Sequence, residues 1–200
     1  MKFYKIFFLT YILFFSYSSL ISQILPSYHG VFDKKENTVT QTLMELPSQT
    51  KIPEVSWVRG YYFQAPTNFT ISGLRVPTDA STQCQNLAVV RFNSGQPPIF
   101  PSFTNDFTQL HITICEEGDQ IIDVNIPVSE NQYIGIYGCR GNTCITSYGL
   151  EGTINFNEYT IDLLRSGMQY NLYNEGVMKN IFDGLNNNPY IGRVELYFSN

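Results

Sequence analysis

Residues 122–128, Ile122-Asp-Val-Asn-Ile-Pro-Val128, alternate along their whole length between aliphatic residues and residues that suit a solvated face. Residues 133–137, Tyr-Ile-Gly-Ile-Tyr, and residues 194–198, Val-Glu-Leu-Tyr-Phe, repeat this period of two. Successive side chains of a β-strand point to opposite faces, so each stretch places its aliphatic residues on one side of a sheet. The period therefore predicts half-buried strands and not amphipathic helices.

Further strands are expected on both sides of these stretches. They cover residues 55–64, 69–76, 87–92, 110–115, 143–148, 153–157, 159–164 and 168–173. Turn-forming residues separate them, for example Ala65-Pro66 and the segment Asn93-Ser-Gly-Gln-Pro-Pro98. Short strands about ten residues apart predict an all-β fold, an antiparallel β-sandwich or jelly roll, over residues 54–200. One helical turn is expected between Gly176 and Leu185.

The first 22 residues have the pattern of a signal peptide. Lys2 and Lys5 precede a short apolar run, and small residues follow it. The run of about ten apolar residues is too short to cross a bilayer, so we expect a secreted, extracellular chain with no membrane span once residues 1–22 are removed. An uncleaved N-terminal anchor is the alternative. Residues 23–53 are expected to form a lead-in segment, with a strand over 38–46 that places Val39, Gln41 and Leu43 on one side.

The charge balance argues against nucleic acid as a partner. The chain has 12 Lys and Arg against 17 Asp and Glu, a net charge of −5, and loss of the two leader lysines makes it −7. Nucleic acids and anionic membranes select clusters of basic residues, and the sequence has no such cluster. Charged residues are 14% of the chain and aromatic residues 15%, so uncharged polar side chains must form much of the surface. That composition suits a β-rich extracellular domain and also suits sugar binding.

The four cysteines, Cys84, Cys115, Cys139 and Cys144, predict two disulfides in an exported chain. Four cysteines allow three pairings. The short loop with Gly141 and Asn142 at its tip favours Cys139–Cys144, which leaves Cys84–Cys115 to join neighbouring strands. A zinc site fits the cysteine spacing poorly, and no metal or other cofactor is expected.

Residues 57–77 resemble a group of poorly characterised secreted β-sandwich domains of mainly environmental bacteria. Those domains open with an Arg-Gly-aromatic-x-Phe strand, an Ala-Pro turn and a Phe-x-Ile-x-Gly-Leu-x-Val-Pro strand, which correspond here to Arg59–Phe63, Ala65-Pro66 and Phe69–Pro77. Similar stretches lie at residues 90–93, 126–129, 134–136, 167–169 and 192–198. The resemblance covers most of the chain after residue 55, implies the sandwich fold and assigns no chemistry. The sorting tail of that group is not expected here.

The pattern of these first strand residues can also be interpreted without the resemblance. Trp57, Tyr61 and Phe63 share one parity and are expected in the core. Arg59 has the same parity, so either a bulge at Gly60 turns it outward, which we favour, or it is buried with a carboxylate partner.

No catalytic set is predicted. His29 and His111 are the two histidines, no G-x-S-x-G motif is present, and the cysteines are assigned to disulfides. A carbohydrate-active hydrolase with two carboxylates on the jelly roll is the enzyme alternative, with candidates that show no paired spacing: Glu195, Asp162, Asp123, Glu151 and Glu158. The acidic turn Glu116–Asp119 lacks the ligand spacing of a calcium loop.

Tyr133 and Tyr137 form the candidate ligand face. If Ile134 and Ile136 point into the core, the two tyrosines stand on the opposite face, where they either meet a ligand or lie under a loop. Asn68-Phe-Thr70 is an N-glycosylation acceptor in a eukaryotic host. The sequence thus predicts a secreted, non-enzymatic binding, adhesion or extracellular-matrix module whose partner is a glycan or an extracellular protein.

Overall fold

The computed structural model describes residues 40–54, 56–184 and 188–200, and for residues 51–54 it describes the backbone alone. The expected signal peptide, His29 and Val39 lie outside the described residues. The prediction of a helical turn between Gly176 and Leu185 is wrong in its described part, because residues 176–184 contain no helix and Phe182–Asp183 form a strand. None of the helices in the described part has the length and apolar character that crossing a bilayer requires.

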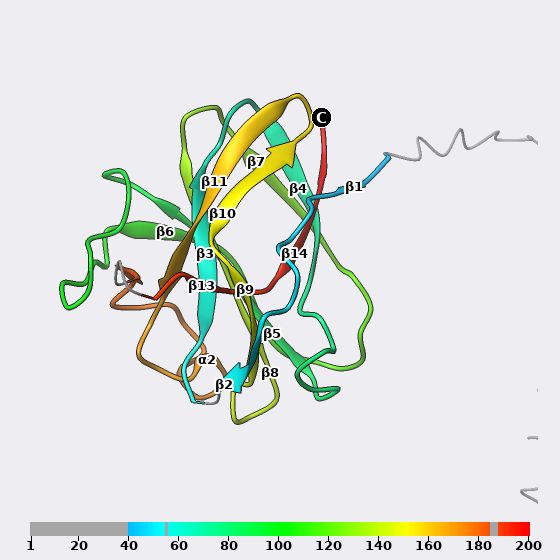
Figure 1. The fold of residues 1–200 in the computed structure, drawn as a ribbon, viewed down its shortest axis with the longest axis vertical. Coiled ribbons are helices and arrows are strands. Elements are labelled where there is room, and N and C mark those ends of the chain that lie inside the picture. Colours follow the sequence, from blue (N-terminus) through cyan, green and yellow to red (C-terminus); the bar gives the residue numbers. More distant parts are fainter. Residues whose placement is uncertain (1–39, 55, 185–187) are drawn as a thin grey trace, which may run out of the picture. The chain divides into compact units, whose positions relative to one another are not determined.

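Strands dominate the described chain (Figure 1). The elements are β1 (Thr42–Leu43), β2 (Lys51–Glu54), β3 (Arg59–Gln64), β4 (Phe69–Arg75), β5 (Gln85–Phe92), β6 (Phe107–Glu116), β7 (Ile122–Val128), β8 (Tyr133–Arg140), β9 (Thr146–Leu150), β10 (Gly152–Phe156), β11 (Tyr159–Gly167), α2 (Leu172–Glu175), β12 (Phe182–Asp183), β13 (Tyr190–Gly192) and β14 (Glu195–Ser199).

Two sheets make the sandwich. The small sheet has the order β1-β14-β4-β7, and the large sheet has the order β10-β11-β3-β8-β5-β6, with β12 paired to β11. A third sheet, β13-β9-β2, lies beside them, and the strand pairs within all three sheets are antiparallel. The all-β antiparallel sandwich expected from the sequence is therefore confirmed, while the jelly-roll connectivity stays a prediction.

The main core lies between the small and the large sheet. It takes the inward-facing residues of both, with β3 contributing Tyr61 and Phe63 and β8 contributing Ile134 and Ile136. A cluster of rings closes one part of it, where Phe156 stacks on Phe198 with a centroid separation of 4.1 Å. Burial of these aromatic and aliphatic side chains is the dominant stabilising contribution.

The outer face of the large sheet is apolar too, and residues 168–183, which we call the cover, lie over it. Met168, Leu172, Met178 and Ile181 of the cover pack in a second core with sheet residues that include Tyr62, Ala88, Val90 and Tyr137. Residues 168–173 were expected to be a strand, and this prediction is wrong. Residues 168–171 contain a bend, and residues 172–173 begin α2, whose N-terminus is capped by the side chain of Asn171.

Tyr61 and Phe63 of β3 are buried in the core as expected, whereas Trp57 and Arg59 are not placed as expected. Trp57 is 42% exposed because the strand begins only at Arg59. Arg59 is buried, and its Nη1 donates to the carbonyl of Met168 at 2.7 Å while its guanidinium lies over the rings of Trp57 and Phe182. The carbonyls of Met168, in the cover, and of the neighbouring Val58 thus hold the cation inside, and the pattern of one strand does not reveal this.

Part of the expected lead-in belongs to the sandwich. β1 pairs with β14 in the small sheet, and β2 pairs with β9. The inward residue near β1 is Met44, which is 1% exposed, whereas Leu43 is 45% exposed. The strand expected over residues 38–46 is thus shorter than predicted, and within the described residues the side that holds Gln41 and Leu43 is the exposed one.

Arg140 is a fully buried cation at the far end of β8 and holds the loops around it. Its guanidinium donates to the carbonyls of Val76, Pro77, Gln83 and Gly118 at 2.6–3.2 Å. Burial lowers the pKa of Arg140 from its ordinary value. Because an arginine side chain has five N–H groups in a fixed fork, one residue can fix several loop segments at once.

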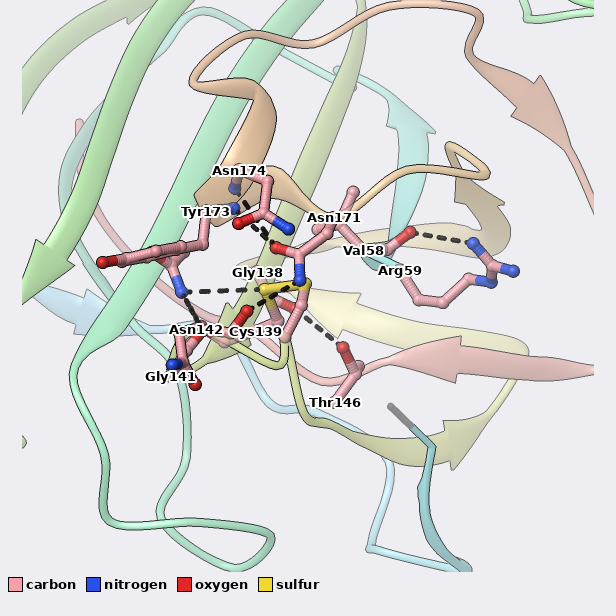
Figure 2. The surroundings of a disulfide bond; sticks show 12 residues. Val58, Arg59, Gly138, Cys139, Gly141, Asn142, Thr146, Asn171, Tyr173 and Asn174 are labelled. Atoms are coloured by element: carbon pink, nitrogen blue, oxygen red, sulfur yellow. Dashed lines mark hydrogen bonds between the residues drawn. A yellow bond between two sulfur atoms is a disulfide. The ribbon is translucent and has the colours of Figure 1, made fainter. Parts of the chain in front are cut away.

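Both expected disulfides are present, Cys84–Cys115 and Cys139–Cys144. Figure 2 shows how the second is tied to the cover, because the Asn171 side chain donates to the Asn142 carbonyl at 2.8 Å and accepts from the first backbone N–H groups of α2. Asn86 links the two disulfide loops, since its buried amide accepts from the Cys115 backbone N–H and donates to the Gly141 carbonyl.

Gly60 permits a close approach of two paired backbones in the large sheet. A Cβ at this position would lie 1.8 Å from the carbonyl oxygen of Ile136. We predict that Gly60→Ala destabilises the protein by about 3 kcal/mol or more, because two paired backbones would have to separate. Gly152→Ala is the matched control, since its Cβ meets nothing within 4 Å. Denaturant unfolding of both variants checks this, and equal stabilities would contradict it.

The two disulfides should contribute unequally to stability. They close loops with sequence separations of 31 and 5 residues. Loop-closure entropy predicts a loss of about 4 kcal/mol for Cys84→Ser with Cys115→Ser, and of about 2 kcal/mol for Cys139→Ser with Cys144→Ser. Unfolding midpoints of the two double variants measure the difference. A larger loss from the short loop would show that its links to the cover outweigh chain entropy.

Candidate functional site

A groove opens on the outer face of the large sheet, at the end that the cover does not reach. Its volume is about 360 Å³. The lining comes from the ends of β3, β8 and β11 and from the turns beside them: Tyr62, Gln64, Ala65, Pro66, Gln96, Asn131, Tyr133, Thr160, Ile161, Asp162 and Leu164. We call this cavity with its lining residues the groove.

Two tyrosine rings are the aromatic residues that line the described part of the groove. The rings of Tyr62 and Tyr133 lie 6.4 Å apart, and Tyr62 packs edge-on against Phe92 behind it. Tyr62 is 1% exposed, whereas Tyr133 is half-buried. Tyr133 is thus partly accessible to solvent, and its ring lies beside Tyr62, which is itself packed against Phe92.

The rim of the groove is polar and almost uncharged. Gln64, Gln96 and Asn131 contribute carboxamides, Thr160 a hydroxyl and Asp162 a carboxylate. Asp162 accepts a hydrogen bond from Thr153 at 2.7 Å through Oδ1. No lysine or arginine lines the groove within the described residues. Such a rim both donates and accepts hydrogen bonds and has no positive charge to bind an anion.

Hydrogen bonds hold the turns around the groove. The turn after β3 and the turn before β8 are joined by backbone bonds of 2.8 Å, from Ala65 to the Gln132 carbonyl and from Asn131 to the Ala65 carbonyl. The turn that contains Gln96 is held by Asp106, which accepts from the side chains of Asn93 and Ser94. These bonds, first the one from Ser94, lower the pKa of Asp106. The rim is therefore largely preorganised.

The structure separates the two tyrosines expected to form a ligand face. Tyr133 lines the groove. Tyr137 is fully buried beneath the cover, and its hydroxyl is hydrogen-bonded to Ser166 at 2.8 Å, so it is not part of a ligand face. The ring folds over Gly135, where an added Cβ would lie 2.6 Å from the Tyr137 hydroxyl oxygen. The alternative that a loop covers the outer tyrosine holds for Tyr137.

Asn68 and His111 both lie away from the groove lining. The Asn68 side chain is exposed in the turn between β3 and β4 and accepts from the Glu130 backbone N–H at 2.8 Å. Its glycosylation stays a prediction. His111 is half-buried on β6, 2.8 Å from the Thr113 hydroxyl, and burial lowers its pKa.

The carboxylates proposed for hydrolysis do not converge in the groove. Glu195 is ion-paired with Arg75 at 2.6 Å, and Asp123 and Glu158 are exposed. Among the described residues that line the groove, Asp162 is the one acidic side chain. Glu151 lines a second cavity of about 440 Å³ together with Glu45, but its Oε1 accepts the Arg165 backbone N–H at 2.6 Å.

The groups that resemble a metal site have other partners. Cys84, Cys115 and Glu117 place ligand atoms within 4.8 Å of one another, but both sulfur atoms are in the disulfide and are not thiolates. In the acidic turn, the Gly118 carbonyl accepts from the Arg140 guanidinium at 3.0 Å. This backbone oxygen of the turn is therefore engaged by an arginine.

The groove residues that sequence analysis missed are Gln64, Gln96, Asn131 and Thr160. Three of them sit in or beside turns, where glutamine and asparagine are common without a ligand. Gln64 and Asp162 share the outward parity of their strands, and that parity is the signal that could have placed them near Tyr133.

Comparison with family models, with curated proteins and with solved structures finds no match to this chain.

Tyr62 connects the groove to the cover through Asp183. Its hydroxyl lies 3.2 Å from Asp183 Oδ2, on β12. Burial raises the pKa of Asp183, and the negative charge of Glu151 adds to this, while hydrogen bonds from Tyr62 and from the Gly184 backbone oppose it. A raised pKa means that the folded state holds the proton more tightly than the unfolded chain. This carboxyl therefore favours folding at acidic pH, and the contribution is lost as the pH rises through the folded-state pKa.

We predict that Asp183→Asn is more stable than the wild type at pH 7 and that the difference shrinks as the pH falls below the ordinary pKa of an aspartate. The asparagine can still accept from Tyr62 but has no charge to desolvate. Urea unfolding at a series of pH values measures this. Asp123→Asn, on the exposed face of β7, is the control for loss of a surface charge. A destabilisation of Asp183→Asn that does not change with pH would contradict the prediction.

Proposed function

We propose that the protein is an extracellular, non-enzymatic binding module that holds a neutral glycan in the groove. The observation that carries this proposal is the half-buried ring of Tyr133 beside three carboxamides in one preorganised cavity. A sugar ring has an apolar face of C–H groups and a belt of hydroxyls. An aromatic ring suits the first, and groups that both donate and accept hydrogen bonds suit the second.

The charge of the groove supports a neutral ligand. Asp162 lies in the lining, and among the described residues no basic side chain balances it. Phosphate, sulfate and carboxylate groups would meet repulsion here with no cation to offset it. Neutral sugars, and sugars that carry an amine, meet no such barrier.

An extracellular site of action is supported by two features. The first 22 residues have the pattern of a signal peptide, and disulfides such as the two found here persist in oxidising compartments. Adhesion to glycan-coated surfaces, or a place in an extracellular matrix, would use such a module.

The hydrolase alternative has one observation in its favour, the shared cavity of Glu45 and Glu151. A retaining or inverting mechanism needs one carboxyl to act as an acid and the other as a nucleophile or base. Glu45 is exposed, and one oxygen of Glu151 is bound to the backbone. The binding function therefore has the better support.

Titration calorimetry with neutral gluco-, galacto-, manno- and xylo-saccharides tests the proposal. We expect one series to bind, and we expect Tyr133→Ala and Gln64→Ala each to weaken that binding about two- to tenfold, the size of an aromatic contact or a hydrogen bond. Tyr133→Phe should retain most of the affinity. Tyr173→Ala, an exposed tyrosine that does not line the groove, is the matched control.

Two results would contradict the proposal. One is the absence of binding to any saccharide of the panel. The other is the release of new reducing ends from the panel, abolished by Glu151→Gln, which would establish the hydrolase instead.

A further inference from the structure

Two exposed apolar side chains lie on the loop that follows the groove residue Gln96. Ile99 is 53% exposed and Phe103 is 46% exposed. The rings of Phe100 and Phe182 pack against Phe103. The ring centroids of the three phenylalanines lie 5.2–5.9 Å apart in edge-on arrangements. We call these four residues the platform. Single exposed apolar side chains are common, but a contiguous group of them marks an interaction site.

The platform is held in place by the cover. The backbone of Thr104 exchanges two hydrogen bonds with Ile181, at 2.8 and 2.9 Å. Phe100 donates to the Asp183 carbonyl at 3.1 Å, and Asp183 donates to the Pro98 carbonyl at 2.8 Å. A reciprocal pair between Asn105 and Asn180 closes the far side. The exposed rings therefore stand on a pinned loop, and a ligand that contacts them need not order that loop first.

Two connections place the platform near the groove. Gln96 lines the groove, and Ile99 follows three residues later, so their Cα atoms are at most about 11 Å apart. Tyr62 also lines the groove, and its hydroxyl is hydrogen-bonded to Asp183, which is next to Phe182. A short oligosaccharide can span the distance from the polar rim to the apolar rings.

We propose that the ligand is an extended neutral oligosaccharide, with one sugar unit in the groove and a following unit stacked on the platform through Phe103 and Ile99. This inference rests on the proposed function and names its ligand class. The polar rim of the groove forms hydrogen bonds with the hydroxyl groups of one sugar unit. The platform offers only apolar area, so it adds affinity for chain length and not for the identity of the sugar.

Binding of one saccharide series, from the monosaccharide to the hexasaccharide, tests this in the full chain. The wild type should bind the hexasaccharide more tightly than the monosaccharide. Phe103→Ala should weaken hexasaccharide binding about two- to tenfold, the contribution of one aromatic contact, and leave monosaccharide binding unchanged. Ile99→Ser is the second variant, since this side chain is more exposed and its loss disturbs the ring cluster less. Tyr173→Ala and Val177→Ser are the matched controls, exposed residues outside both the groove lining and the platform.

The outcomes separate the inference from the proposed function. If no saccharide of any length binds, the proposed function is wrong. If saccharides bind with an affinity independent of length, or if both platform variants bind the hexasaccharide as the wild type does, the function stands and the platform is not a subsite. If Phe103→Ala weakens the monosaccharide equally, the platform belongs to the first subsite and the inference of a second one is overturned.

Discussion

The large sheet is apolar on both faces, and this constraint organises the rest of the molecule. Its inner face is buried by the small sheet, and its outer face would expose Tyr62, Val90 and Tyr137 if nothing lay over it. Burial of apolar surface is the main driving force of folding, so the sheet requires a second layer on its outer side. The cover supplies that layer. The groove exists because the cover ends at β12, and the platform exists because the loop that the cover holds in place carries its own aromatic residues.

Buried arginines join the loops to the sheets in this molecule. Arg140 donates to four loop carbonyls, and Arg59 donates to the carbonyl of Met168 at the start of the cover. A buried charge is costly unless its hydrogen bonds are satisfied, and backbone carbonyls provide them without a second charge. Each arginine thereby fixes irregular segments that have little apolar area of their own.

The period of two predicted most of the strands because those residues are half-buried on an alternating pattern. The strand at Ile122–Val128 matches its predicted bounds, and both disulfide pairings follow from loop length. The cover escaped prediction because residues 168–183 bury scattered side chains, which show no period. The burial of Arg59 depends on a carbonyl 109 residues away in the sequence. Of the candidate site, Tyr133 was predicted, while Gln64, Gln96 and Asn131 come together only through the pairing of distant strands.

The position of β14 has a consequence for how the chain reaches this state. β14 lies inside the small sheet, between β1 and β4, and Phe198 is buried against Phe156 in the main core (Figure 1). A polypeptide is made from its N-terminus onward, so the small sheet stays split until residues 195–199 emerge from the ribosome or the export channel. Until then the slot between β1 and β4 is open, with unpaired backbone on both sides. Vectorial synthesis thus leaves the closing of this sheet to β14, and a chain exported unfolded would complete it only after that strand has crossed.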